Sequence, residues 1–168
     1  MTRSFPLIAL IVFALCFTSV LAVRKTPRTT DLAENFIVIG KIYCDPCHFE
    51  FKSRLSKPLS NVKVILSCRK EEGNNVTVVK EAMTNEEGNY IIKVDGEHEE
   101  EICEVYPDSN DGECSLPMAN KSDRVGLTKD MGVSSLVRYV NPLGFMTKSI
   151  DSQCGSVVSE LGLNQLDD

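Results

Sequence analysis

The 168-residue sequence contains no tryptophan, two histidines and four tyrosines, which leaves little material for several kinds of functional site. Sugar-binding platforms stack carbohydrate on flat aromatic rings, and such rings are scarce here. Histidine is the most frequent general base in enzymes, but His48 and His98 stand in segments that we interpret as loops. Neither has a second ligand at zinc-binding spacing, so we expect no metal site.

Motifs for nucleophilic catalysis and for phosphate binding are also missing. The sequence has no Gly-x-Ser-x-Gly motif and no glycine-rich phosphate-binding loop. Aspartate and glutamate are plentiful, so a wall hydrolase with two catalytic carboxylates is an alternative, although their crowding in loops gives no paired geometry. We expect a protein that is not an enzyme and that uses no cofactor.

Positively charged residues are fewer than negatively charged ones. The chain has 18 lysines and arginines against 24 aspartates and glutamates, a formal net charge of −6. A surface of this sign repels the phosphate backbone, so nucleic acid is not an expected partner.

One long apolar run is present, near the N-terminus. Arg3 precedes an uninterrupted apolar stretch from Leu7 to Phe17, which is the pattern of a secretory signal peptide. Val20 and Ala22 fit the two small pockets of signal peptidase, so residues 1–22 are predicted to be removed after Ala22. An uncleaved membrane anchor is the alternative, but the run is shorter than the roughly 20 residues needed to span a bilayer.

Nothing later in the sequence suggests retention in a membrane or in the cell. No second apolar run follows, and residues 161–168 resemble neither a lipid-anchor signal nor a retention signal. We therefore expect secretion to the extracellular space or cell wall, with no membrane insertion after cleavage. Because Arg3 is removed with the signal, the formal charge of the mature chain becomes −7.

The cysteine count fits an oxidising compartment. Of seven cysteines, Cys16 lies in the predicted signal, and six remain: Cys44, Cys47, Cys68, Cys103, Cys114 and Cys154. An even number in a secreted chain predicts three disulfides, and the count alone allows 15 pairings.

The close pair Cys44-Asp45-Pro46-Cys47 permits two sharper alternatives, a thioredoxin-like redox site or half of a zinc site. A redox pair of this type opens a helix whose N-terminus lowers the pKa of the first thiol. Here the following residues, 49–54, run directly into Ser56-Lys57-Pro58, without a long amphipathic helix. We favour structural disulfides, and the redox alternative stays open to test.

The remaining pattern is that of short strands. Residues 23–34 are polar and aperiodic and predict a flexible extension, and the ordered domain is expected over 35–168. Alternating and β-branched segments predict strands at 36–43, 62–68, 76–83, 90–95, 101–106, 124–128 and 144–146. The turn at 85–89 contains Gly88 and predicts a hairpin between the strands on either side of it, and 156–163 predicts a short helical turn. The fold class is therefore all-β, a small disulfide-bonded barrel or sandwich.

Two N-glycosylation sequons occur, Asn75-Val76-Thr77 and Asn120-Lys121-Ser122, and a secreted chain can use both. Two acidic segments have plainer interpretations. Residues 97–101 predict a solvated loop, since consecutive acidic residues repel each other. Residues 108–112 look like a calcium loop only superficially, because Pro107 would occupy the first ligand position, and we interpret them as a turn.

The octapeptide Gly40-Lys41-Ile42-Tyr43-Cys44-Asp45-Pro46-Cys47 resembles the Gly-x-Val-Tyr-Cys-Asp-x-Cys signature of the pollen Ole e 1 allergen and extensin-like family of secreted plant proteins. The residue after the signature is His48, where the family usually has Arg. Later segments are similar in kind and order: 59–68, 84–90, 103–105, and 141–145 before Cys154. The resemblance spans about residues 35–163.

The resemblance implies a small β-barrel or sandwich with cysteines paired first to fifth, second to sixth and third to fourth. In this chain the pairs are Cys44 with Cys114, Cys47 with Cys154, and Cys68 with Cys103. The family is associated with pollen, pollen tubes and other growing tissues. The sequence therefore predicts a non-enzymatic signalling or binding protein, with a cell-surface receptor or wall polysaccharide as its partner. A structural or carbohydrate-binding wall module is the alternative.

Overall fold

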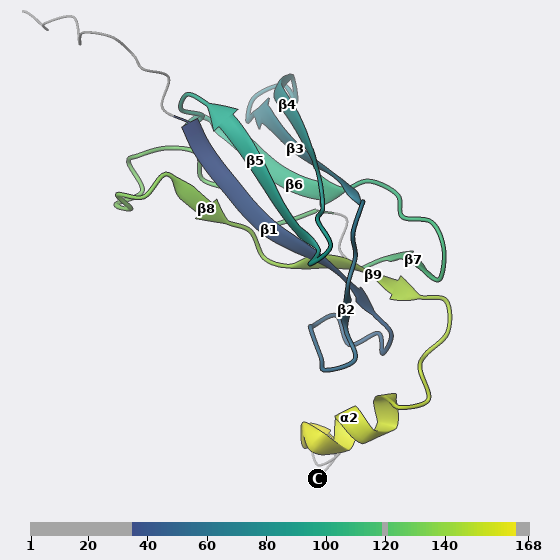
Figure 1. Ribbon diagram of the computed structural model, residues 1–168. Helices are drawn as coiled ribbons and strands as arrows, with labels where there is room; N and C mark the ends of the chain where they lie inside the picture. Colours follow the sequence, from purple (N-terminus) through teal and green to yellow (C-terminus); the bar gives the residue numbers. More distant parts are fainter. Residues whose placement is uncertain (1–34, 119–120, 164–168) are drawn as a thin grey trace, which may run out of the picture. The chain divides into compact units, whose positions relative to one another are not determined.

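In the computed structural model, residues 35–118 and 121–163 are described, and all of them lie in one compact unit of the chain, residues 33–168 (Figure 1). The predicted signal peptide and extension, residues 1–34, lie outside the described residues. The elements are β1 (Asn35–Asp45), β2 (Lys57–Pro58), β3 (Lys63–Lys70), β4 (Val76–Met83), β5 (Asn89–Asp95), β6 (Glu101–Pro107), β7 (Cys114–Pro117), β8 (Val137–Tyr139), β9 (Leu143–Thr147) and α2 (Cys154–Glu160).

The larger of two sheets is built around the long strand β1. The first part of β1 pairs antiparallel with β5 and parallel with β8, and its last part pairs antiparallel with β2 and parallel with β9. β7 continues this sheet beyond β9. The smaller sheet has the order β4-β3-β6. β1 therefore pairs with four other strands, its last part carries Cys44, and Cys47 follows two residues after its end.

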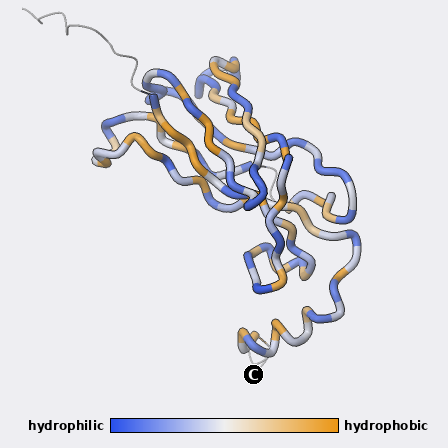
Figure 2. Tube along the Cα trace, viewed as in Figure 1, coloured by the Kyte–Doolittle hydropathy of each residue, from blue (hydrophilic) through white to orange (hydrophobic). Residues whose placement is uncertain are grey.

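Alternation of buried and exposed residues gives each sheet one inward face. In β3, for example, Val64, Leu66 and Cys68 are buried, and the residues between them are partly exposed. Because successive strand residues point to opposite faces, this pattern places one face of each sheet against a common core, to which β1, β3, β5, β6 and β9 all contribute. Figure 2 shows the hydrophobic residues along β1 and β5. The predicted fold class, mostly β with three disulfides and a short helix, is confirmed.

The predicted strand at 124–128 is wrong in a specific way. Val125 and Leu127 are buried, as the alternation suggests, and Val125 N–H donates to the Cys103 carbonyl. The carbonyls of Gly126 and Thr128 bond to a side chain instead of a neighbouring strand, because the guanidinium of Arg138 donates to them at 2.6 and 2.7 Å. Residues 124–128 therefore have the alternating burial of a strand but are not hydrogen-bonded into either sheet as a strand.

The predicted hairpin between 76–83 and 90–95 is half right. The chain does reverse at the turn, where Gly88 has a φ of +75°. However, β4 pairs with β3 and β5 pairs with β1, so the two strands belong to different sheets. The turn itself spans both sheets, since the Gly88 carbonyl accepts from Ile42 of β1 while Thr84 N–H donates to Val62 beside β3.

Three short strands, β2, β7 and β8, were not predicted, and α2 begins two residues before the expected helical turn and ends at Glu160. Within 35–118 and 121–163, no helix has the length and apolar character required to cross a bilayer.

Candidate functional site

The segment that carries Cys44 and Cys47 is shaped by the buried carboxylate of Asp45. Its Oδ1 accepts the N–H of Cys47 at 3.0 Å and its Oδ2 accepts the N–H of Glu50 at 2.9 Å. The chain turns sharply here, with His48 and Glu50 at positive φ. The two cysteines lie on either side of the start of this turn and bond to different segments of the chain, Cys44 to Cys114 and Cys47 to Cys154. Burial, together with the nearby carboxylates of Asp45 and Glu50, raises the pKa of the adjacent Tyr43.

Each of the six predicted cysteines is in a disulfide. The bonds join Cys44 to Cys114, Cys47 to Cys154, and Cys68 to Cys103, the same pairs that the family resemblance implies. They close sequence separations of 70, 107 and 35 residues, and each bridge of this size contributes about 4 kcal/mol in the chain-entropy model. Cys44 and Cys47 are not bonded to each other, so the geometry is not that of a redox dithiol.

The two histidines are occupied by structural contacts. The Nε2 of His48 lies 2.7 Å from the Thr147 carbonyl oxygen. The Nδ1 of His98 lies 2.8 Å from the Glu101 carboxylate. Among the described residues, one group of potential metal ligands comes together, Cys68, His98 and Glu101, but the sulfur of Cys68 is bonded to Cys103. A three-ligand site is therefore not available there.

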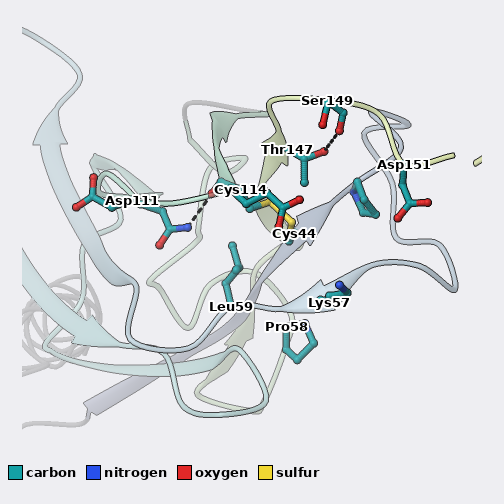
Figure 3. Close-up of a pocket in the computed structure, with 12 residues that line it drawn as sticks. Cys44, Lys57, Pro58, Leu59, Asp111, Cys114, Thr147, Ser149 and Asp151 are labelled. Carbon is teal, nitrogen blue, oxygen red and sulfur yellow. Dashed lines mark hydrogen bonds between the residues drawn. A yellow bond between two sulfur atoms is a disulfide. The ribbon is translucent and has the colours of Figure 1, made fainter.

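A cavity of about 330 Å³ lies beside the Cys44–Cys114 disulfide (Figure 3). The Thr147 hydroxyl donates to the Ser149 carbonyl at 2.6 Å, and the lining includes no histidine. Asp111 and Asp151 lie on opposite sides of the disulfide in Figure 3. Three carboxylates, those of Asp111, Glu113 and Asp151, line the cavity, and among its lining residues no histidine is present to serve as a general base for a hydroxyl nucleophile. Its walls are Cys44, Pro46, Lys57, Pro58, Leu59, Asn110, Asp111, Glu113, Cys114, Thr147, Ser149 and Asp151.

The two acidic segments have structural roles. In 97–101, Glu101 accepts from the Thr77 hydroxyl as well as contacting His98. In 108–112, Asp108 lies 3.1 Å from the Lys63 ammonium. The backbone N–H of Ser109, followed by Lys63, lowers the pKa of Asp108. Each segment is thus tied to a neighbouring strand through its own side chains.

Of the two sequons, one falls in the described part of the chain. Asn75 is exposed in the turn between β3 and β4, where Gly73 and Asn74 have φ of +93° and +55°. Asn120 lies outside the described residues. The accessibility of Asn75 is what the modification requires, and glycosylation stays a prediction.

An exposed apolar row crosses the outer face of the larger sheet, and the sequence pattern did not reveal it. The strand registers place Ile91 of β5 opposite Ile39 of β1, and Ile39 opposite Tyr139 of β8. Ile91 is 59 % exposed and Tyr139 is 81 % exposed. Paired residues on adjacent strands point to the same face, so the three side chains form one row.

A second row lies next to it on the same face. Here Lys93 of β5, Ile37 of β1 and Val137 of β8 are in register, and Lys41 flanks the first row on its other side. We name Ile37, Ile39, Ile91, Val137 and Tyr139 the outer apolar face. It could have been found from the sequence only if β8 had been recognised, and a three-residue strand gives too little periodicity for that.

The chain matches the family model "Pollen protein Ole e 1 like" over residues 34–162. It is 42 % identical over 156 residues to an Olee1-like protein of Betula pendula, covering 90 % of both chains. It is 38 % identical over 160 residues to pollen allergen Che a 1 of Chenopodium album, covering 92 % of both. It is 35 % identical over 136 residues to the anther-specific protein LAT52 of Solanum lycopersicum, covering 80 % of this chain and 84 % of that protein.

A solved structure agrees. The major plantain pollen allergen Pla l 1 superposes with a TM-score of 0.63 at 27 % identity, covering 72 % of this chain and all of that one. The fold described above therefore recurs in a solved structure, and the chain belongs to the pollen protein Ole e 1-like family.

Proposed function

We propose that this protein is a secreted, non-enzymatic recognition protein of pollen or other growing plant tissue, and that it binds a cell-surface protein through the outer apolar face. The row Ile91, Ile39 and Tyr139 carries the proposal. Side chains this apolar on a water-facing sheet are characteristic of surfaces that are covered by a partner.

The scaffold supports this proposal. Three disulfides suit an oxidising, extracellular location, and β1 is paired with four strands, so the face is formed before any partner arrives. A preformed face loses little conformational freedom on binding. In the part of the chain that the structure describes, neither histidine is hydrogen-bonded to a hydroxyl group, and every described cysteine is in a disulfide.

The names of the relatives support the proposed setting. One is an anther-specific protein, and several are pollen allergens. Growth of a pollen tube takes place in contact with cell walls and cell surfaces, where a secreted binding module would meet its partner.

Wall polysaccharide is the second candidate partner, and one observation favours it. Tyr139 is 81 % exposed on this sheet face, and tyrosine rings can stack on sugars. The same face is the predicted site in both cases, so one set of variants tests both partners.

The test compares Ile91→Ser and Tyr139→Ala with a matched control, Ile150→Ser. Ile91 and Ile150 are similarly exposed, at 59 % and 61 %, but Ile150 belongs to neither row of the outer apolar face. Binding of labelled protein would be measured on intact pollen-tube protoplasts, which lack walls, and on purified wall polysaccharides.

We expect saturable binding to protoplasts that the two face variants reduce at least tenfold and the control leaves unchanged. Saturable binding to polysaccharide alone, lost in Tyr139→Ala, would favour the second candidate. Equal binding by all three variants would overturn the assignment of the face.

A further inference from the structure

The strand β4 has a free edge. Among the described residues it pairs with β3 alone, although β5 follows it directly in the chain. Thr84 N–H donates to the Val62 carbonyl, and donors alternate along a strand. The N–H groups of Lys80 and Ala82 therefore face β3, and those of Val79 and Glu81 face away from it.

The sequence of this edge favours further strand pairing. Val76, Val79 and Met83 are each more than half exposed, and β-branched residues are frequent in β4. An edge of this kind is a template for a strand from another molecule. One ion pair, Lys80 with Asp95 at 3.2 Å, connects β4 across to β5, and its side chains leave the outward N–H groups of Val79 and Glu81 without a strand partner in the described chain.

The sequon residue Asn75 directly precedes this edge strand. Figure 1 shows β4 and β5 close together at their shared turn and separated at the other end, where Asn75 precedes Val76. Eight strand residues extend for about 26 Å at roughly 3.3 Å per residue. A branched glycan of several sugars attached at Asn75 has a reach comparable to this length. It would therefore cover the N-terminal part of the free edge of β4.

We propose that an N-linked glycan on Asn75 shields the free edge of β4 and prevents it from pairing with β4 of a second copy of this chain. The modification is then a device that keeps the secreted protein monomeric. This role is independent of the outer apolar face, which lies on the other sheet. It requires the glycan to be present, and this requirement is tested first.

The experiment uses protein secreted from plant cells. Intact-mass analysis before and after removal of N-linked glycans establishes whether Asn75 is occupied. Wild type, Asn75→Gln and the control Asn120→Gln, which removes the other sequon, are then compared by light scattering and sedimentation at equal concentrations. Asn75→Gln is preferable to a change at Thr77, because the Thr77 hydroxyl bonds to the Cys68 carbonyl and to Glu101 in the fold.

We expect wild type and Asn120→Gln to be monomeric and Asn75→Gln to show about twice the monomer mass or more. Amide hydrogen exchange should show new protection at Val79 and Glu81 in the associated form. Adding Val79→Pro to Asn75→Gln removes an outward donor and should restore the monomer, since proline on an edge strand opposes pairing.

Three outcomes would overturn the proposal. The first is an unmodified Asn75 in the secreted protein. The second is a monomeric Asn75→Gln at every concentration tested. The third is an associated Asn75→Gln in which the Val79 and Glu81 amides exchange as quickly as in wild type, which would place the contact elsewhere.

Discussion

Gly40 and Tyr90 lie opposite each other in the β1–β5 ladder, and the ring of Tyr90 occupies the space that a side chain at Gly40 would need. A Cβ atom built on Gly40 would collide with the Tyr90 hydroxyl and ring. Tyr90 is 1 % exposed, so it cannot swing outward without opening the core. The glycine that begins the family signature is thus explained by packing.

Gly40→Ala should lower the free energy of unfolding by about 1 to 3 kcal/mol, the usual cost of overpacking a core. Gly155→Ala is the matched control, because an added Cβ there meets nothing within 4 Å and alanine is the better helix former in α2. We expect the control to gain up to about 1 kcal/mol. Chemical denaturation of both variants with disulfides intact makes the comparison, and equal effects would refute the packing argument.

Tyr90→Phe should leave stability unchanged or increase it. The Tyr90 hydroxyl is buried and has no hydrogen-bond partner among the residues described, so removing it leaves no bond broken. An unpaired buried polar group costs about 1 to 3 kcal/mol, part of which the phenylalanine recovers. A clear loss of stability on denaturant unfolding would show that the hydroxyl has a partner, for example an internal water molecule.

The same variant should change the alkaline stability profile. Burial raises the pKa of Tyr90 well above its ordinary value. The folded protein therefore keeps the proton above about pH 10, where an unfolded tyrosine loses it. The stability linked to the protonated Tyr90 side chain is therefore fully present below pH 10. As pH rises above that point, the wild-type free energy of unfolding falls. The free energy of unfolding of Tyr90→Phe should fall less steeply than that of wild type between pH 9.5 and 11. Parallel curves of unfolding free energy against pH for the two proteins would contradict this.

Arg138 explains why the predicted strand at 124–128 failed, and its replacement gives a further prediction. Its buried guanidinium donates to the carbonyls of Gly126, Thr128 and Ser135 and lies 4.9 Å from the centre of the Phe36 ring. A lysine cannot reproduce this fork of donors. Arg138→Lys should destabilise the protein by about 2 kcal/mol, within the range for hydrogen bonds to charged groups.

The change should also be local. Hydrogen exchange at residues 126–135 should accelerate more in Arg138→Lys than exchange in β3 and β6 does. Uniform acceleration across the protein would mean that the arginine supports the whole core and not this segment.

The sequence predicted the core strands well, and it failed where long-range contacts decide the structure. Alternation at 62–68 was sufficient because β3 is paired on both sides and buried on one face. At 124–128 the same alternation was misleading, because a side chain from residue 138 takes the carbonyls that a ladder would use. β2 and β7 are short strands that pair with residues elsewhere in the sequence, and each ends in a proline, so neither has a local signal.

The features of the candidate site also differ in whether the sequence could predict them. The cysteine framework could be stated from the family resemblance, since the octapeptide and four later cysteines occur in order. The outer apolar face could not, because it depends on a parallel register between residues about 100 positions apart, Ile39 and Tyr139.

Loss of one disulfide gives another prediction. Cys68→Ser should lower the free energy of unfolding by roughly 2 to 5 kcal/mol, as expected for a native bridge in a small secreted domain. It should leave Cys103 as a single thiol, detectable by titration after unfolding. A variant as stable as wild type would show that this bridge adds nothing to the scaffold.

The central claim is that the six cysteines build a rigid scaffold and do no redox chemistry. Peptide mapping of the secreted, unreduced protein tests it most directly. The account predicts peptides linking Cys44 to Cys114, Cys47 to Cys154 and Cys68 to Cys103, with essentially no free thiol on titration in denaturant. A Cys44–Cys47 bridge that can be reduced selectively without unfolding would contradict the account and indicate an oxidoreductase.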